Sequence, residues 1–184
     1  MIRTILLRSA FALWAGSIAT AASAQTAPAK KPANPTEQVV LLGQFGDWGA
    51  YKATPGGKKV CFALSKPTSA TTEPAGRKRD PSYAFVSSRP AEKVKNEVSV
   101  IVGYPQKPGH DAAATIGAAN YVMYTQNDGA WVKNAAEEAQ MVEAMRKGAD
   151  LVVKSESALG TKTTDTYSLK GMAQALDKVS EECK

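Results

Sequence analysis

The stretch FGDWGAYKATPGGKKVCFALSKP, residues 45–67, places two strand-like segments on either side of a turn. The turn is Thr54-Pro55-Gly56-Gly57, in which proline fixes φ and the glycines tolerate positive φ. Side chains after the turn alternate between two faces, with Val60, Phe62 and Leu64 on one and Cys61 and Ala63 on the other. The pattern predicts two strands, near residues 48–53 and 58–64, with a cysteine inside the second.

A second cysteine lies on the apolar stripe of an expected C-terminal helix. Its apolar residues recur at steps of three and four: Leu169, Met172, Leu176, Val179 and Cys183. Cys183 therefore faces inward. The simplest arrangement lays this helix across the sheet face that carries Cys61, with a disulfide between sheet and helix.

Cys61 and Cys183 are the only cysteines of the chain. In an oxidising compartment a single pair of thiols usually forms a disulfide. Closing so long a loop contributes roughly 5 kcal/mol in the chain-entropy description. The alternatives are two free, buried thiols or pairing between chains.

Residues 1–24 have the layout of a secretory signal peptide. Arg3 and Arg8 give a basic start, an apolar run follows, and Ala22-Ser23-Ala24 provides small residues before the expected cleavage site. The apolar run is shorter than the roughly 20 residues that span a bilayer as a helix, and no later segment is long or apolar enough. An uncleaved amphiphilic anchor is the alternative.

The remaining chain divides into a leader and one domain. Residues 25–37 (QTAPAKKPANPTE) are rich in Pro, Ala, Lys and Thr, which predicts a flexible leader. Residues 38–184 are enough for a single domain with a substantial core.

Most of that domain is predicted to be β-structure. Further strands are expected at residues 39–43, 83–87, 97–104, 114–116, 120–125, 130–133, 149–156 and 161–167, the last two joined at Leu159-Gly160. A helix is expected from Asn134 as N-cap to about Lys147, with Ala135, Ala139, Val142 and Met145 inward and Gly148 at its end. The predicted fold is mainly β with two helices: an antiparallel β-sandwich-like domain whose C-terminal helix is disulfide-linked to an early strand.

Two surface features are candidate interaction sites. Arg77, Lys78 and Arg79 are adjacent in a loop bracketed by Gly and Pro, and would suit contact with anionic lipid, lipopolysaccharide or an acidic partner. A solvated loop that aids solubility is the plainer interpretation. Trp48 and Tyr51 could form an exposed aromatic surface, although a Trp that begins a strand is more often a core residue, which we favour.

No catalytic, cofactor or metal residue is predicted. His110 is the only histidine, which rules out a multi-histidine metal site, and the sequence has neither a nucleophile elbow nor a Gly-rich phosphate loop. The aspartates are interpreted as turn or strand-surface residues: Asp47, Asp80, Asp111, Asp128 and Asp165. Two carboxylates meeting in space for hydrolysis remain the open alternative.

The net charge is +6, or +4 without the two arginines of the signal, and it is spread along the chain. Such a mild excess favours anionic surfaces but is not dense enough to imply nucleic acid. The expected partner is an envelope protein or an anionic envelope polymer.

Three motifs carry a family resemblance: Phe45-Gly46-Asp47-Trp48, Gly57-Lys58-Lys59-Val60-Cys61, and Tyr167-Ser168-Leu169-Lys170-Gly171 before a helix that ends in cysteine. Together with the signal, they resemble the invasion-associated locus B (IalB) family of bacterial envelope proteins, over nearly all of residues 38–184. Many relatives have a cysteine soon after the tryptophan, and this chain has none there. The resemblance implies an exported, non-enzymatic protein of the periplasm, outer membrane or secreted fraction that acts by binding. In some pathogens the family is linked to host-cell entry. It supplies no catalytic or ligand residues.

Overall fold

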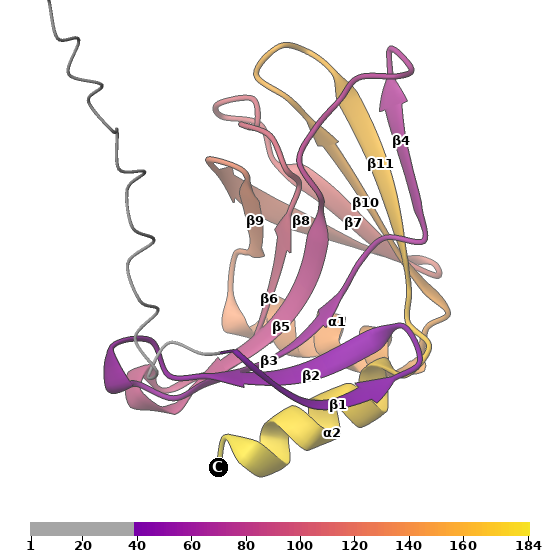
Figure 1. Ribbon diagram of the computed structural model, residues 1–184. Helices are drawn as coiled ribbons and strands as arrows, with labels where there is room; N and C mark the ends of the chain where they lie inside the picture. The colour runs from indigo at the N-terminus through magenta and orange to yellow at the C-terminus, as the bar shows by residue number, and fades with distance from the viewer. Residues whose placement is uncertain (1–38) are drawn as a thin grey trace, which may run out of the picture. The chain divides into compact units, whose positions relative to one another are not determined.

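The computed structural model describes residues 39–184, so the signal peptide and leader predicted for residues 1–37 lie outside the described residues. The described chain forms eleven strands and two α-helices (Figure 1). The strands are β1 (Val40–Phe45), β2 (Trp48–Ala53), β3 (Val60–Ser65), β4 (Ser69–Glu73), β5 (Tyr83–Arg89), β6 (Val94–Ile101), β7 (Ala112–Ile116), β8 (Ala119–Gln126), β9 (Gly129–Val132), β10 (Asp150–Glu156) and β11 (Lys162–Ser168). The helices are α1 (Ala135–Lys147) and α2 (Met172–Glu182).

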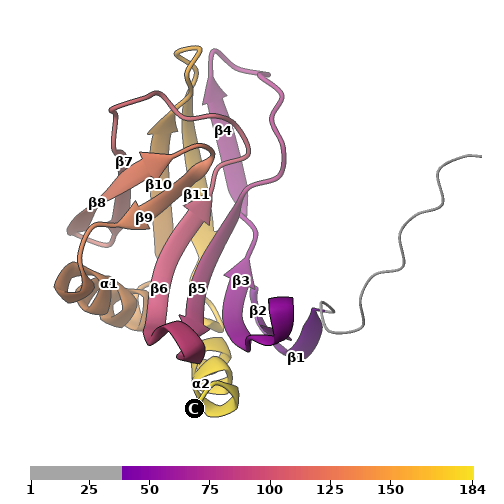
Figure 2. The same ribbon diagram turned by 90° about the vertical axis from the view of Figure 1, so that its left-hand side faces the viewer.

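All eleven strands belong to one antiparallel sheet, in the order β1-β2-β3-β5-β6-β9-β8-β7-β10-β11-β4. The sheet curls, so that β10 and β11 lie behind β5 and β6 and both helices lie at the same end (Figure 2). Hydrogen bonds cross the space between these layers, including one from the Tyr167 hydroxyl to Ser82 Oγ at 3.2 Å. The predicted fold class is confirmed, with the two layers supplied by a single continuous sheet.

Helix α2 covers the β1–β2–β3 part of the sheet. Its buried side chains are Met172, Leu176 and Val179 of the predicted stripe, together with Ala175. Cys61 on β3 is fully buried and forms a disulfide with Cys183, with a Cα–Cα distance of 5.9 Å. The predicted bridge between an early strand and the C-terminal helix is therefore confirmed.

Two motifs that are distant in sequence meet at one corner of the sheet. The Trp48 indole N–H donates to the Ser168 carbonyl at 2.8 Å, and the Asp47 amide donates to the Lys170 carbonyl at 3.0 Å. Gly171 adopts a φ of 88°, and a Cβ there would lie 1.8 Å from the Phe45 carbonyl oxygen. Only glycine fits this position, because positive φ and close backbone contact both disfavour a side chain.

Helix α1 is present where predicted, and two of its predicted inward residues, Val142 and Met145, are buried. Asn134 Oδ1 accepts from the Glu137 amide at 2.9 Å, so the predicted N-cap is confirmed. Ala135 and Ala139 are exposed, contrary to the prediction, and the buried residues are Met141, Val142 and Met145. Alanine has too little apolar surface to fix the rotation of a helix, so the larger methionines decide which face is buried.

Strand β4 was not predicted. Its sequence, Ser-Ala-Thr-Thr-Glu, is mostly exposed and has no apolar alternation. It forms because its backbone pairs with β11, with Thr72 opposite Thr163. An edge strand held mainly by backbone hydrogen bonds leaves little signal in side-chain pattern.

Candidate functional site

The three basic side chains of the loop between β4 and β5 do not share one environment. Arg77 and Lys78 are exposed, whereas the Arg79 side chain turns inward and is only 11% exposed. Arg79 Nη1 donates to Asp165 Oδ2 at 2.7 Å and to the Val102 carbonyl at 2.9 Å, and Nη2 also contacts the same carboxylate. Placing Arg79 with the exposed cations of the interaction loop was therefore wrong.

Asp165 was predicted at a strand surface and is instead buried at 1% exposure on the inner face of β11. Its carboxylate is balanced by Arg79, and the hydrogen bond between them raises the pKa of the guanidinium. Nearby, burial raises the pKa of the Tyr167 phenol. The ion pair joins the loop before β5 to the opposite layer of the sheet.

A cavity of about 490 Å³ opens beside this ion pair. Its volume lies within the range of roughly 300–1,000 Å³ that small-molecule sites occupy. Its walls come from the loop of Arg77 and Lys78, from Tyr104 and Pro105 after β6, and from the β10–β11 turn at residues 157–161. We call it the Tyr104 cavity. Leu159, at the tip of that turn, is 93% exposed.

Most hydroxyl groups in the walls of the Tyr104 cavity already have hydrogen-bond partners. The Tyr104 hydroxyl and Thr163 Oγ1 are 2.5 Å apart, and the Tyr104 ring lies 5.9 Å from the Arg79 guanidinium carbon. Ser157 Oγ accepts from two amides of its own turn, and Thr72 Oγ1 donates to the Pro74 carbonyl. The uncommitted wall surface is therefore chiefly apolar.

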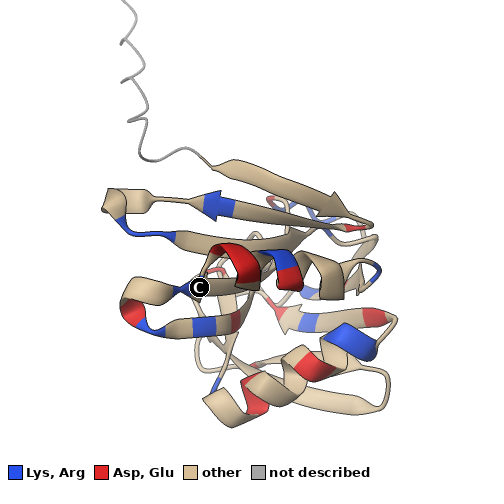
Figure 3. Ribbon diagram, turned by 90° about the horizontal axis from the view of Figure 1, so that it is seen from below, with Lys and Arg blue, Asp and Glu red and all other residues tan. Residues whose placement is uncertain are grey.

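Arg77 and Lys78 are the rim cations of this cavity. Within residues 39–184 neither side chain forms an ion pair, and both lie at the wall. An anionic group could therefore be held at the rim without displacing an existing partner. Charge elsewhere is mixed: seen from below, acidic and basic segments are interspersed (Figure 3).

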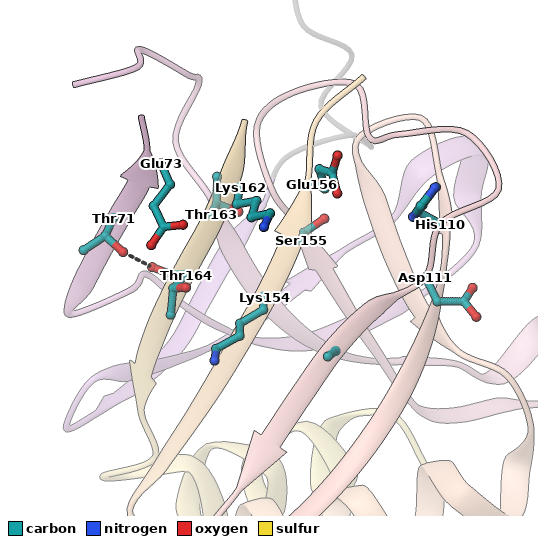
Figure 4. A pocket seen from close by; sticks show the side chains of 11 residues that line it. Thr71, Glu73, His110, Asp111, Lys154, Ser155, Glu156, Lys162, Thr163 and Thr164 are labelled. Carbon is teal, nitrogen blue, oxygen red and sulfur yellow. Dashed lines mark hydrogen bonds between the residues drawn. The ribbon is translucent and has the colours of Figure 1, made fainter. Parts of the chain in front are cut away.

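A second hollow, of about 380 Å³, lies over β4, β10 and β11 (Figure 4). It gathers acidic, basic and hydroxyl side chains, including Glu73, Glu156, Lys162 and the single histidine, His110. Lys107 Nζ donates to Glu156 at 2.8 Å and lowers the pKa of that carboxyl. A general acid in glycoside hydrolysis needs the opposite shift, so Glu156 does not fit that role.

Trp48 is fully buried, so an exposed aromatic surface that includes it is wrong and the favoured core interpretation holds. Tyr51 is half-buried on the opposite face of the sheet, where it stacks on Phe62 with ring centroids 5.4 Å apart. Phe85 continues this row, 5.9 Å from Phe62. The sequence did not predict this row of three aromatic rings, although it did predict that Phe62 lies on the face opposite Cys61.

Residues 39–184 contain no group of three or more His, Cys, Asp or Glu that could hold a metal ion. Neither α1 nor α2, the helices of this described part, is long and apolar enough to cross a membrane.

The protein-family model for invasion associated locus B (IalB) protein matches residues 51–180. The chain belongs to the IalB family. The matched IalB region contains the Tyr104 cavity, its rim cations and the Arg79–Asp165 pair. No curated protein and no solved structure gave a significant match.

Proposed function

We propose that this IalB protein is exported to the bacterial envelope and acts there by binding an anionic component, without catalysis. Residues 1–24 would direct export, residues 25–37 would form a leader, and residues 38–184 would be the binding domain. The protein would reside in the periplasm, at the outer membrane or in the secreted fraction. Host-cell entry would apply only where the bacterium has a host.

Export is supported by family membership and by the disulfide. Disulfides persist in oxidising compartments outside the cytoplasm, and the Cys61–Cys183 bridge connects α2 to the core. The signal-like sequence of residues 1–24 agrees with this location.

The observation that carries the binding proposal is the pair of rim cations beside the Tyr104 cavity. Arg77 and Lys78 are exposed, lack acidic partners within the described chain, and lie over a cavity of ligand size. In the second hollow, the hydrogen bond from Lys107 lowers the pKa of the Glu156 carboxyl, whereas a general acid in hydrolysis needs a raised pKa.

Retention of the mature protein on immobilised dextran sulfate tests this proposal. We expect salt-sensitive retention, weakened in the Arg77→Ala/Lys78→Ala variant. The matched control is Lys58→Ala/Lys95→Ala, which removes the same charge from exposed lysines that form no ion pair within residues 39–184. An equal loss of retention in both variants would show that net charge alone causes binding, and would overturn the site.

The competing hydrolase hypothesis has a direct assay. Purified mature protein is incubated with cell-wall glycan, and released reducing ends are measured in the wild type and in Glu73→Gln and Glu156→Gln. We expect no release above buffer. Hydrolysis by the wild type that disappears in either variant would contradict the binding proposal and support catalysis by carboxylates.

A further inference from the structure

We propose that the Tyr104 cavity binds a free, single-chain anionic amphiphile, such as a fatty-acid carboxylate. Its head group would contact Arg77 and Lys78, and its chain would enter the cavity. This inference rests on the proposed function and narrows the ligand from any anionic envelope component to one with an apolar tail.

The first argument is the chemistry of the walls. Tyr104, Pro105, Ala158 and Leu159 contribute apolar surface from two separate segments. The polar wall atoms of Thr72, Ser157 and Thr163 are engaged in internal hydrogen bonds. A polysaccharide needs many free donors and acceptors, whereas an alkyl chain needs only apolar contact.

The second argument is charge. Asp165 would repel an anion if it were bare, but its carboxylate is paired with Arg79 behind the wall. The charges left at the rim are therefore the cations of Arg77 and Lys78. Charge-assisted hydrogen bonds from Arg and Lys to a carboxylate are among the stronger polar contacts.

The third argument is size. A cavity of about 490 Å³ lies toward the lower end of the range of small-molecule sites, roughly 300–1,000 Å³. It suits one chain of moderate length better than a two-chain lipid. The exposed side chain of Leu159 at its mouth adds apolar surface where the chain would enter.

Isothermal titration calorimetry with decanoate, below its micelle concentration, tests the inference on the mature protein. We expect one site per chain, with affinity reduced about tenfold or more in Arg77→Ala/Lys78→Ala and unchanged in Lys58→Ala/Lys95→Ala. A neutral amphiphile of equal chain length should bind more weakly than decanoate.

A second variant separates the cavity from the rim. Ala158→Trp should fill the cavity and abolish decanoate binding, yet leave retention on dextran sulfate intact because the rim cations remain. Circular dichroism and thermal melting confirm that the variant is folded. If it does not fold, Leu159→Ser provides the same test, with weakened decanoate binding expected.

The outcomes separate the two proposals. Retention on dextran sulfate that depends on the rim cations, without decanoate binding, would overturn the amphiphile and leave the anionic site standing. Failure of both assays would overturn both. Preference for anionic phosphatidylglycerol vesicles, with no binding of free decanoate, would replace the free amphiphile with a membrane surface.

Discussion

Arg79 and Asp165 are separated by 86 residues in sequence, and Arg79 Nη1 donates to Asp165 Oδ2 at 2.7 Å between the two layers of the curled sheet. The pair combines a loop residue with the inner face of β11. Its role is to join the layers and to remove a negative charge from the back of the Tyr104 cavity.

Removing one partner of this pair should destabilise the fold strongly. Arg79→Ala leaves the buried Asp165 carboxylate without its cation, and we expect the free energy of unfolding to fall by about 3–5 kcal/mol. Urea denaturation measures this change. The double variant Arg79→Met/Asp165→Leu should recover part of the loss, because both polar groups are then replaced. A double variant less stable than Arg79→Ala would contradict this account.

The disulfide should contribute a large share of stability. Its cysteines are 122 residues apart, and the chain-entropy description gives about 5 kcal/mol for such a loop. Cys61→Ala/Cys183→Ala should therefore melt at a much lower temperature than the oxidised wild type. Mass spectrometry without reduction should find the two cysteine peptides linked. Free alkylation of both thiols in untreated protein would refute the bridge.

Gly171 and Gly160 form a matched pair for backbone strain. Both have positive φ, 88° and 80°, but only a Cβ at residue 171 meets the backbone, at the Phe45 carbonyl. Gly160→Ala should cost about 1 kcal/mol from conformational strain alone. Gly171→Ala should cost about 3 kcal/mol or more, because the corner between β1 and α2 must also shift. Equal costs by chemical denaturation would show that the close contact is unimportant.

Glu138 on α1 gives a pH-dependent prediction. Desolvation raises the pKa of its carboxyl from the ordinary 4.5, although the Val98 amide donates to it at 2.8 Å. The folded protein then holds its proton at pH values where the unfolded chain has lost it, so Glu138 contributes stability that decreases as pH rises through this window. Glu138→Gln retains an acceptor for Val98 and removes the titration.

The measurement is the unfolding free energy of wild type and Glu138→Gln from pH 4 upward. The variant should gain stability relative to wild type with rising pH, and the difference should level off above the folded pKa. A difference that does not vary with pH would mean that this carboxyl titrates normally in the folded protein.

Local pattern was sufficient for much of the fold. Cys61 lies in a strand whose side chains alternate between two faces, and Cys183 lies on the apolar stripe of a helix. The disulfide joins the strand face and the helix face that these two patterns predict. The order of the strands in the sheet could not be predicted, because β3 pairs with β5 and the polar strand β4 pairs with β11 at the far edge. Such contacts depend on the whole chain.

The candidate site was predicted only in part. Arg77, Lys78 and Arg79 look equivalent in sequence, and only the distant Asp165 separates the third from the others. The Tyr104 cavity has walls from three segments, so no single stretch could reveal it. Trp48 was correctly favoured as core, since a large ring at a strand end is usually buried.

Cys61 is synthesised 122 residues before Cys183. The Cys61 thiol therefore has no native disulfide partner until almost the whole chain has been made. In the oxidising compartment of the proposed function, Cys61 can during that interval form a disulfide only with a thiol of another molecule, and thiol–disulfide exchange must then reverse it. If the protein is exported as proposed, newly exported molecules should therefore depend on an isomerase or reductant until α2 arrives, whereas completed molecules should not.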